Sequence, residues 1–396
     1  MGGSVVESLT ARIRRDGPIA FSEFMEAALY GPGGFFSRGQ GPGRSDGDFL
    51  TSPQTGSLFG ILVARALDMW WSGMGEPDPF FLVEAGAGDG RLARDVLRAE
   101  PACGPALRYV LVEVSEAARA AQAGALRIEP AGDVLGSQVV DEWDTPEPAP
   151  RQGPILTSLP DLPAGPLTGV VLANELLDNI PVDIVERTDS GWQEVRVGAV
   201  AEGTLVEVPV AAAPDLARAA DAVLAGESAP AGSRLPVPRA AATWLAEATH
   251  VLDRGIVALL DYAVPVRELL ERGPDGWLRT YRSHQRAAAP LKSPGTTDIT
   301  VDLPLEYLRE SIESSGMSVV TATTQTDWLT ALGLPDLVAD GEQIWAEGAH
   351  RGDLEALAGR SRATEAAALT ADPGLGAHTV LVATTPGAFG RAARSG

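Results

Sequence analysis

The chain has 396 residues, of which 45% are hydrophobic and 21% charged, so it can form a globular protein of two or three domains. Its 53 acidic residues outnumber its 31 basic residues by 22, and so acidic a surface repels nucleic acid and anionic membranes. The single cysteine, Cys103, excludes a disulfide framework within the chain. The four histidines lack metal-ligand spacing, so we predict no metal site.

The N-terminus has no apolar signal core, and no apolar run reaches the length of a membrane span. We therefore expect a cytoplasmic protein. Arginine almost entirely replaces lysine, and alanine, glycine and proline are abundant, which indicates a high-GC genome and suggests a bacterial source. We allow for a homodimer, because the sequence does not fix the oligomeric state.

The first part of the chain, residues 1–78, is predicted to form an N-terminal helical cap or lid. Apolar residues at helical spacing predict a helix within residues 1–30, and a Gly-rich stretch follows it. Ser52 before Pro53 is typical of a helix start, and the apolar face of the next helix runs from Leu58 to Trp70.

From residue 79 onward, apolar strands alternate with helices, which predicts an α/β domain with a parallel sheet covered on both faces. Two insertions interrupt it, an antiparallel β-rich one at about 182–210 and a long polar connection at about 263–302. Residues 144–168 are Pro-rich and predict a loop. The predicted strands are 80–84, 109–113, 169–174, 255–262, 318–324 and 378–384, and the later helices begin at 304, 326 and 353.

The most specific local motif is the turn from Glu84 to Gly90 between a strand and a helix. Its glycines, Gly86, Gly88 and Gly90, let a ligand approach the backbone closely. A dinucleotide fingerprint would have its third glycine at position 91, where this chain has Arg91. The turn therefore suits a cofactor without a pyrophosphate, such as S-adenosylmethionine, with Glu84 placed to contact its ammonium group. An ordinary strand–helix corner is the alternative.

Two further acidic motifs follow predicted strands. Glu113 ends the second strand, where a carboxylate can accept both hydroxyls of a ribose, unless it is only a solvated strand end. Asn174, Glu175 and Asp178 follow a later strand, where the two carboxylates could hold a guanidinium and accept a proton. The alternative there is a helix start with Asn174 as its cap.

The chain as a whole resembles the MidA-like methyltransferases, relatives of a mitochondrial complex I assembly factor that methylates protein arginine. The matching motifs run in order through the chain. They are Tyr30–Phe36, Gly47–Pro53, Phe59-Gly60, Glu84–Gly90, Val112–Ser115, Gln122, Asn174–Asp178, Pro181-Val182, Leu260–Tyr262, Leu278–His284, Asp298–Thr300, Thr324-Gln325 and Leu329–Leu334.

The resemblance implies a Rossmann-like class I methyltransferase sheet that binds S-adenosylmethionine. It assigns Gly86, Gly88, Gly90 and Glu113 to the cofactor. It also suggests that four residues before the cap helix, Asp48, Thr51, Ser52 and Pro53, lie against the cofactor or in a lid, although Ser52 and Pro53 could serve as a cap alone. Three residues of the long connection, Tyr281, Arg282 and the catalytic candidate His284, would reach the substrate.

The resemblance implies N-methylation of a protein arginine, but the substrate side departs from the family pattern. The family usually has an acidic residue where this chain has Gln54 or Thr55, and its Asp-Pro after the loop histidine is Ala289-Pro290 here. The stretch Asp298–Asp302 is shorter than the corresponding family stretch and lacks the histidine found there. A tailoring methyltransferase for a specialised metabolite or small peptide, and a non-catalytic assembly factor, therefore remain alternatives. A nicotinamide oxidoreductase is disfavoured by Arg91. The expected partner is a protein, peptide or small-molecule methyl acceptor.

Overall fold

The computed structural model describes residues 5–38, 51–136, 152–200, 203–282, 285–350 and 354–389. The chain forms two compact units, which we call the sheet unit and the insertion unit. The sheet unit comprises Leu50–Asn174, Ala248–Asp261 and Gly316–Gly396. The insertion unit comprises Met1–Phe49, Glu175–Glu247 and Tyr262–Ser315.

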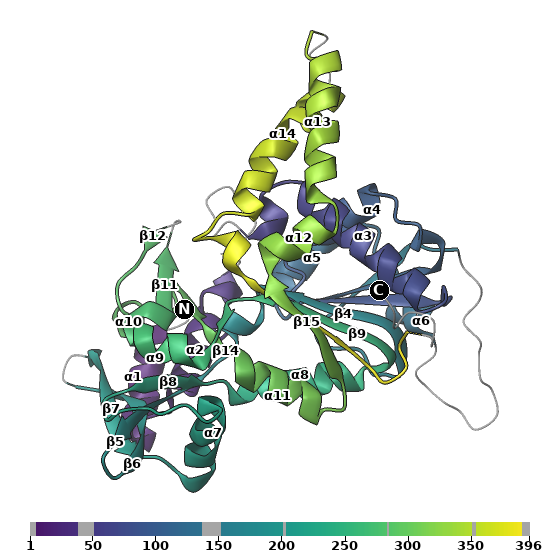
Figure 1. Ribbon diagram of the computed structural model, residues 1–396. Helices are drawn as coiled ribbons and strands as arrows, with labels where there is room; N and C mark the ends of the chain where they lie inside the picture. Colours follow the sequence, from purple (N-terminus) through teal and green to yellow (C-terminus); the bar gives the residue numbers. More distant parts are fainter. Residues whose placement is uncertain are drawn as a thin grey trace. The chain divides into compact units, whose positions relative to one another are not determined.

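The sheet unit is built on a seven-stranded sheet in the order β15-β16-β9-β4-β1-β2-β3, of which β15, β9 and β4 are labelled in Figure 1. Neighbouring strands from β3 to β9 pair in parallel, whereas β16 is antiparallel to both β9 and β15. The chain runs outward from β1 to β2 and β3 and then returns to β4 on the other side of β1. The strand order therefore reverses between β1 and β4, and ligands bind beyond the carboxyl ends of strands at such a point. This topology confirms the predicted Rossmann-like α/β fold.

The bounds of the sheet-unit strands follow the apolar runs of the sequence. They are β1 Phe80–Ala85, β2 Leu107–Val112, β3 Ile155–Leu159, β4 Leu167–Asn174, β9 Leu252–Asp261, β15 Ser318–Thr324 and β16 Thr379–Thr384. The helices are η2 Ser52–Gln54, α3 Leu58–Gly73, α4 Arg91–Arg98, η3 Gly104–Ala106, α5 Glu116–Ala125, α6 Ala131–Leu135, α12 Gln325–Ala331, α13 Leu334–Gly348, α14 Leu354–Leu369 and η7 Leu375–Ala377.

The core of the sheet unit combines the strands with α3, whose predicted apolar face is buried as expected. Burial of these side chains supplies the main driving force for folding of this unit. Trp70 of α3 stacks on Trp328 of α12, with ring centroids 6.5 Å apart. The C-terminal helices are thus part of the same core as the first helix of the unit.

The predicted helix start at Ser52 is wrong, because α3 begins at Leu58 and a separate 3₁₀ turn, η2, precedes it. Ser52 is fully buried, and its hydroxyl donates a hydrogen bond to Gln325 Oε1 at 2.9 Å instead of capping a helix. The first amide of α3, on Leu58, donates to Glu365 Oε2 at 2.9 Å. A carboxylate from α14, distant in sequence, therefore performs the capping that the local pattern predicted for Ser52.

The insertion unit contains a four-stranded antiparallel sheet in the order β7-β6-β5-β8, which confirms the predicted β-rich insertion. The strands of the whole insertion unit are β5 Asp183–Thr188, β6 Gly191–Ala199, β7 Leu205–Ala211, β8 Arg234–Val237, β10 Ala263–Val264, β11 Leu278–Arg282, β12 Gln285–Arg286, β13 Asp298–Val301 and β14 Leu303–Pro304. Its helices are α1 Val5–Asp16, α2 Phe21–Leu29, η1 Phe36–Arg38, η4 Leu177–Asn179, α7 Pro214–Leu224, α9 Val266–Arg272, α10 Pro274–Trp277, η6 Pro290–Lys292 and α11 Leu305–Ser314, and α8, Arg239–His250, begins in it.

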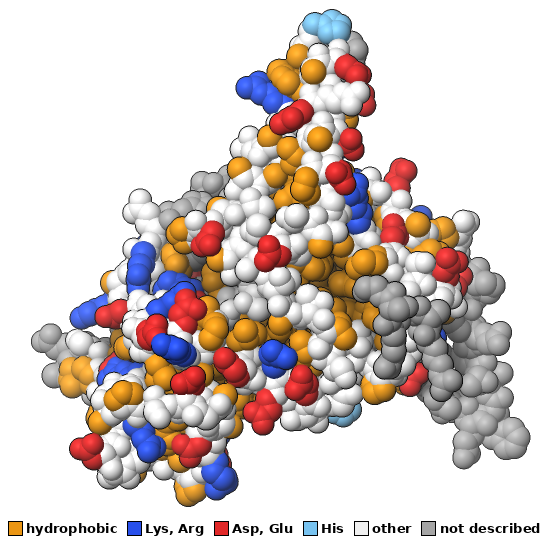
Figure 2. Space-filling model, in the orientation of Figure 1, with side chains coloured by type: hydrophobic (Ala, Val, Ile, Leu, Met, Phe, Trp, Pro, Cys, Tyr) orange, Lys and Arg blue, Asp and Glu red, His pale blue; other side chains and the backbone are white. Residues whose placement is uncertain are grey.

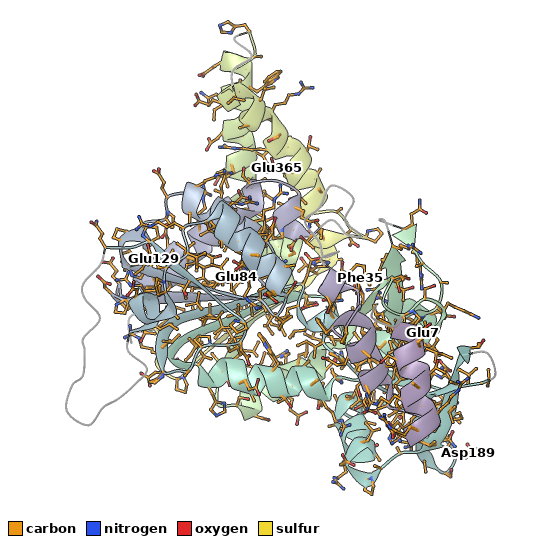
Figure 3. All side chains as sticks on the ribbon, turned by 180° about the vertical axis from the view of Figure 1, so that it is seen from behind. Glu7, Phe35, Glu84, Glu129, Asp189 and Glu365 are labelled. Carbon is orange, nitrogen blue, oxygen red and sulfur yellow. The ribbon has the colours of Figure 1, made fainter. Side chains whose placement is uncertain are left out.

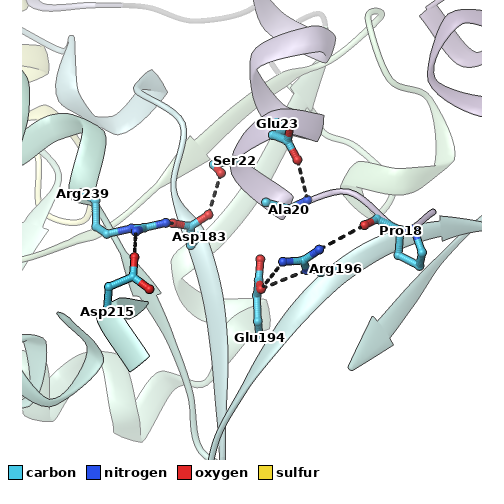
Figure 4. A network of polar contacts seen from close by, with 9 residues as sticks. All are labelled: Pro18, Ala20, Ser22, Glu23, Asp183, Glu194, Arg196, Asp215 and Arg239. Atoms are coloured by element: carbon cyan, nitrogen blue, oxygen red, sulfur yellow. Dashed lines mark hydrogen bonds and ion pairs between the residues drawn. The ribbon is translucent and has the colours of Figure 1, made fainter. Parts of the chain in front are cut away.

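Asp183 joins three segments of the insertion unit through one buried carboxylate (Figure 4). It accepts a hydrogen bond from the Ser22 hydroxyl at 2.6 Å and forms an ion pair with Arg239 at 2.6 Å. Arg239 also pairs with Asp215 at 3.0 Å. Because a buried charge is costly unless it is paired, this network fixes α2 against β5 and the start of α8.

Three expectations about the irregular regions need correction. The connection at 263–302 contains helices and a three-stranded sheet, β12-β11-β13, because its apolar residues, among them Trp277, Ile299 and Val301, are buried despite the many turn residues. The predicted loop at 144–168 contains β3, which extends the parallel sheet. Residues 50–78, predicted to belong to the cap, lie in the sheet unit, because α3 packs into its core.

Within the described part of the chain, no helix combines the length and apolar character that crossing a bilayer requires.

A tight approach between β4 and β9 generates a stability prediction. A Cβ added to Gly255 would lie 2.0 Å from the carbonyl oxygen of Gly169, its partner in the register. Gly255→Ala should therefore lower the free energy of unfolding by more than about 2 kcal/mol, because the two strands must move apart. Urea unfolding measures this effect. Gly124→Ala in α5, where a Cβ would meet no atom within 4 Å, is the control and should be neutral or slightly stabilising. Equal effects of the two substitutions would contradict the analysis.

Candidate cofactor and acceptor sites

The glycine turn after β1 is anchored to the end of β2. The amides of Gly86 and Ala87 both donate to the carbonyl oxygen of Val112, at 2.9 and 3.0 Å. Gly86, Gly88 and Gly90 have φ values of 72°, 53° and 79°, a region that other residues rarely adopt. A Cβ on Gly88 would meet no atom within 4 Å, so this side of the turn is open to a ligand.

Glu113 holds the turn from the next strand. One carboxylate oxygen, Oε2, accepts the Gly88 amide at 2.9 Å, and Oε1 accepts the Ser115 amide at 2.8 Å. A carboxylate can accept about four hydrogen bonds, so Glu113 keeps acceptor capacity beside the open face of Gly88. Glu113 is therefore an oriented part of the turn and more than a solvated strand end.

Gln122 of α5 also holds the glycine turn through a hydrogen bond, a role that the sequence analysis did not assign. Its amide nitrogen donates to the Gly88 carbonyl at 2.7 Å, and its oxygen accepts the Ser158 hydroxyl at 2.5 Å. Gln122 is fully buried, and it is a long polar side chain in an otherwise Ala-rich helix. That contrast was the available signal, because a buried amide needs partners and here finds them on the turn.

Glu84, labelled in Figure 3, is a buried carboxyl at the end of β1. It accepts a hydrogen bond from the Tyr109 hydroxyl at 2.7 Å. Burial raises the pKa of Glu84 to about 8, with smaller contributions from Asp89 and Glu113 and an opposing one from Tyr109. The sequence analysis missed Tyr109, whose signal was a hydroxyl within a largely aliphatic strand.

These features fit S-adenosylmethionine better than a dinucleotide. Asp89 and Glu113 place negative charges beside the turn, and these would repel a pyrophosphate. A cation favours the ionised form of Glu84, so an ammonium group suits that position. The remaining acceptor capacity of Glu113 suits ribose hydroxyls.

The 3₁₀ turn η2 lies beside α4, the helix that follows the glycine turn. It contains the predicted residues Ser52 and Pro53, and the Thr51 amide donates to Gln54 Oε1 at 3.3 Å. The structure thus places these residues next to the helix of the cofactor motif. Asp48 lies outside the described residues, as does His284.

The motif after β4 divides between the two units. Asn174 is the last residue of β4 and lies at the carboxyl edge of the sheet, two strands from β2. Glu175, the next residue, has a φ of 51° without being glycine, which is a strained conformation that clusters at functional sites. The alternative, a helix start capped by Asn174, is not what forms: the short turn η4 follows, in which Asp178 is buried and Leu176 holds the cap position.

Glu175 and Asp178 share their surroundings with Tyr262 in the insertion unit. Burial raises the pKa of Tyr262 above its ordinary value, and the negative charges of Glu175 and Asp178 raise it further. Tyr262 therefore stays protonated and remains a hydrogen-bond donor. The Arg279 guanidinium lies over its ring, 5.3 Å from the centroid, and is itself paired with buried Asp302. Sequence analysis had not given Tyr262 or Arg279 a role.

Asn179 connects three of the sequence motifs within the insertion unit. Its side-chain amide donates to Asp298 Oδ1 and to the Ile299 carbonyl, both at 3.0 Å. Its carbonyl accepts the Tyr30 hydroxyl at 3.2 Å. Tyr281 pairs with Asp298 across β11 and β13. The motifs that begin at Tyr30, Asn174, Leu278 and Asp298 thus meet around one short turn.

The comparisons with known proteins agree with this chemistry. Residues 62–323 match the model of a family described as "Putative S-adenosyl-L-methionine-dependent methyltransferase". The chain belongs to this methyltransferase family. The enzyme is 30% identical to the Drosophila melanogaster homolog of the mitochondrial protein arginine methyltransferase NDUFAF7, over 79% of this chain and 71% of the relative. Its identity to human NDUFAF7 is 28%, over 80% and 70% of the two chains.

A solved structure supports the cofactor assignment. The methyltransferase is similar to a COG1565 superfamily member and likely methyl transferase from Burkholderia thailandensis bound to S-adenosyl-homocysteine, with a TM-score of 0.77 and 28% identity. The similarity covers 98% of this chain and 94% of the other. The fold class, the enzyme class and the cofactor S-adenosylmethionine predicted from the sequence are thereby confirmed. The residues assigned to bind the cofactor stay a prediction.

Glu84 gives the enzyme a distinctive pH dependence of stability. The folded state keeps its proton up to about pH 8, whereas an ordinary glutamate releases it near pH 4.5. Between these values the folded state binds more protons, so burial of Glu84 costs more stability as the pH rises. The free energy of unfolding of Glu84→Gln should therefore rise relative to that of the parent, by up to about 1.4 kcal/mol per pH unit in this window. Above the window the difference should level off. Chemical unfolding from pH 5 to pH 9 measures the difference.

The control for this prediction is Glu116→Gln, which changes an exposed glutamate of α5. Its difference from the parent should stay constant over the same pH range. A Glu84→Gln profile parallel to that of the parent would contradict the assignment.

Glu113 provides the test of the cofactor site. Glu113→Ala removes both the grip on Gly88 and the remaining carboxylate acceptors, so we expect S-adenosylmethionine to bind at least about tenfold more weakly. Isothermal titration calorimetry measures the affinity. Half-buried Glu129, which pairs with Arg127 rather than with the turn, is the control as Glu129→Ala. Unchanged affinity in Glu113→Ala would refute the role.

Proposed function

We propose that this methyltransferase methylates a guanidinium nitrogen of a protein arginine. The curated relatives named above carry the name protein arginine methyltransferase. The observation that carries the proposal here is the pair of carboxylates, Glu175 and Asp178, placed directly after β4 and beside Tyr262. A guanidinium is the methyl acceptor that such a pair recognises best.

The chemistry assigns each of these side chains a task. The two carboxylates would bind and orient the guanidinium by charge-assisted hydrogen bonds. When a guanidinium nitrogen forms its bond to carbon it must lose a proton, and Asp178 or Glu175 would accept it. Tyr262, held protonated, would donate to one carboxylate and keep it in place. S-adenosylmethionine, when bound, supplies a methyl group on a positively charged sulfur, which leaves as the neutral thioether.

The strained backbone of Glu175 favours a functional over a purely structural role. A non-glycine residue at positive φ costs about 1–3 kcal/mol, and such strain is retained where the surroundings require that conformation. A simple helix start would not need it. The cost is consistent with a carboxylate that must point in one direction.

The test is mass spectrometry of proteins incubated with the enzyme and S-adenosylmethionine. We expect a methyl-sized mass increase on arginine in a protein acceptor. Asp178→Asn should lower turnover by about a hundredfold or more, because it removes a carboxylate that binds or deprotonates the acceptor, with cofactor affinity within twofold of the parent.

The matched control is Asp189→Asn, which changes an exposed aspartate in the turn between β5 and β6 of the same unit (Figure 3). It should react like the parent. Methylation only of small metabolites or free peptides would replace the proposal by a tailoring reaction. Cofactor binding without any methylated product would favour a non-catalytic assembly role.

A further inference from the structure

The chain has one stretch whose charge opposes that of the whole protein. Between Asp275 and Asp298 it contains four basic residues, Arg279, Arg282, Arg286 and Lys292, and no acidic residue. Lys292 is also the only lysine of the chain. In a protein with 22 more acidic than basic residues, this stretch is a local reversal of charge.

The structure separates one of these cations from the other three. Arg279 points inward, where its side chain is 13% exposed and pairs with Asp302. Arg282 on β11, Arg286 on β12 and Lys292 on η6 are exposed, and none forms an ion pair with a described residue. We call these three residues the cationic edge. Their charge is not neutralised by the described part of the enzyme.

The backbone that carries the cationic edge is held by strand pairing and hydrogen bonds. β11 pairs with β13 from Leu278 to Tyr281, and in the short pairing of β11 with β12 Tyr281 lies opposite Arg286 and Arg282 opposite Gln285. After β12, the Ala287 amide donates to the Thr280 carbonyl at 2.8 Å, and the Thr280 hydroxyl donates to the Ala288 carbonyl at 2.5 Å. The Arg286 guanidinium also donates to the Asp275 carbonyl. These contacts fix the backbone that carries the exposed cations, which limits the entropy lost on binding.

The space-filling view shows the same concentration of charge. Several Lys and Arg side chains gather over the region of α10, β11 and β12 in Figure 2, where acidic side chains lie among them, and acidic side chains are also spread over the rest of the visible face. A partner with a short acidic segment complements this surface. A long polyanion such as nucleic acid would extend onto the acidic surroundings and be repelled.

We infer that the cationic edge docks an acidic polypeptide segment. Exposed cations of this kind attract such a segment and orient it, with a strong dependence on salt. That the segment belongs to the methyl acceptor rests on the proposed function. On that basis the enzyme selects arginine-containing proteins that also carry a nearby run of Asp and Glu.

The test removes the three charges from the full-length enzyme as Arg282→Gln, Arg286→Gln and Lys292→Gln together. The probe is a fluorescein-labelled peptide of about ten alternating Glu and Ser residues, and fluorescence anisotropy at low salt measures its binding. We expect the triple variant to bind about tenfold more weakly or worse, since each exposed charge pair contributes only modestly. Added salt should weaken binding to the parent.

The matched control is a triple variant, Arg14→Gln, Arg218→Gln and Arg309→Gln, which removes three exposed arginines elsewhere in the insertion unit. It should bind the peptide within twofold of the parent. A peptide with Gln in place of Glu should bind neither the parent nor the control variant. Equal binding by both triple variants, or a parent that prefers a single-stranded oligonucleotide or anionic vesicles to the acidic peptide, would overturn the inference.

Peptide binding needs no methyl transfer, so the two proposals fail separately. An enzyme that binds the peptide through the cationic edge but methylates no protein would keep the docking surface and lose its assignment to a methyl acceptor. An enzyme that methylates protein arginine but does not bind the peptide would overturn the docking surface alone.

Discussion

The cofactor half of the enzyme depends on the way in which one residue, Gly88, is held. Its amide is bound by Glu113 and its carbonyl by Gln122, so the turn is fixed from two sides by side chains of the next βα unit. Glycine is required because the backbone there adopts a positive φ. A Cβ at Gly88 would meet no atom within 4 Å, so this side of the turn is open to a ligand.

Electrostatics then decides which ligand the turn accepts. Acidic side chains surround it, and the most deeply buried of them, Glu84, keeps a proton at neutral pH. A buried carboxyl of this kind responds to a cation by ionising, while the charges of Asp89 and Glu113 disfavour a phosphate. The same turn geometry with uncharged or basic side chains around it would suit a dinucleotide. The neighbouring side chains, and not the glycines, therefore determine which cofactor the turn binds.

The insertion unit concentrates its chemistry around η4. Asn179 ties this turn to β13 and Tyr30, while Asp178 and Glu175 share the surroundings of Tyr262. Arg279 pairs with Asp302, and its guanidinium lies over the Tyr262 ring. The ion pair of Arg279 with Asp302 is internal, whereas Arg282, Arg286 and Lys292 of β11, β12 and η6 are exposed.

The sequence by itself determined the parallel sheet, the glycine turn with Glu113 and the acidic motif after β4, because apolar periodicity and turn chemistry are local properties. It also revealed the antiparallel insertion, whose alternation of residues is equally local. Tertiary structure alone decided that Glu365 caps α3 while Ser52 binds Gln325, since these partners lie hundreds of residues apart. It likewise decided the roles of Tyr109, Gln122 and Tyr262, because the pKa and the partners of a buried polar group depend on neighbours that no local pattern specifies.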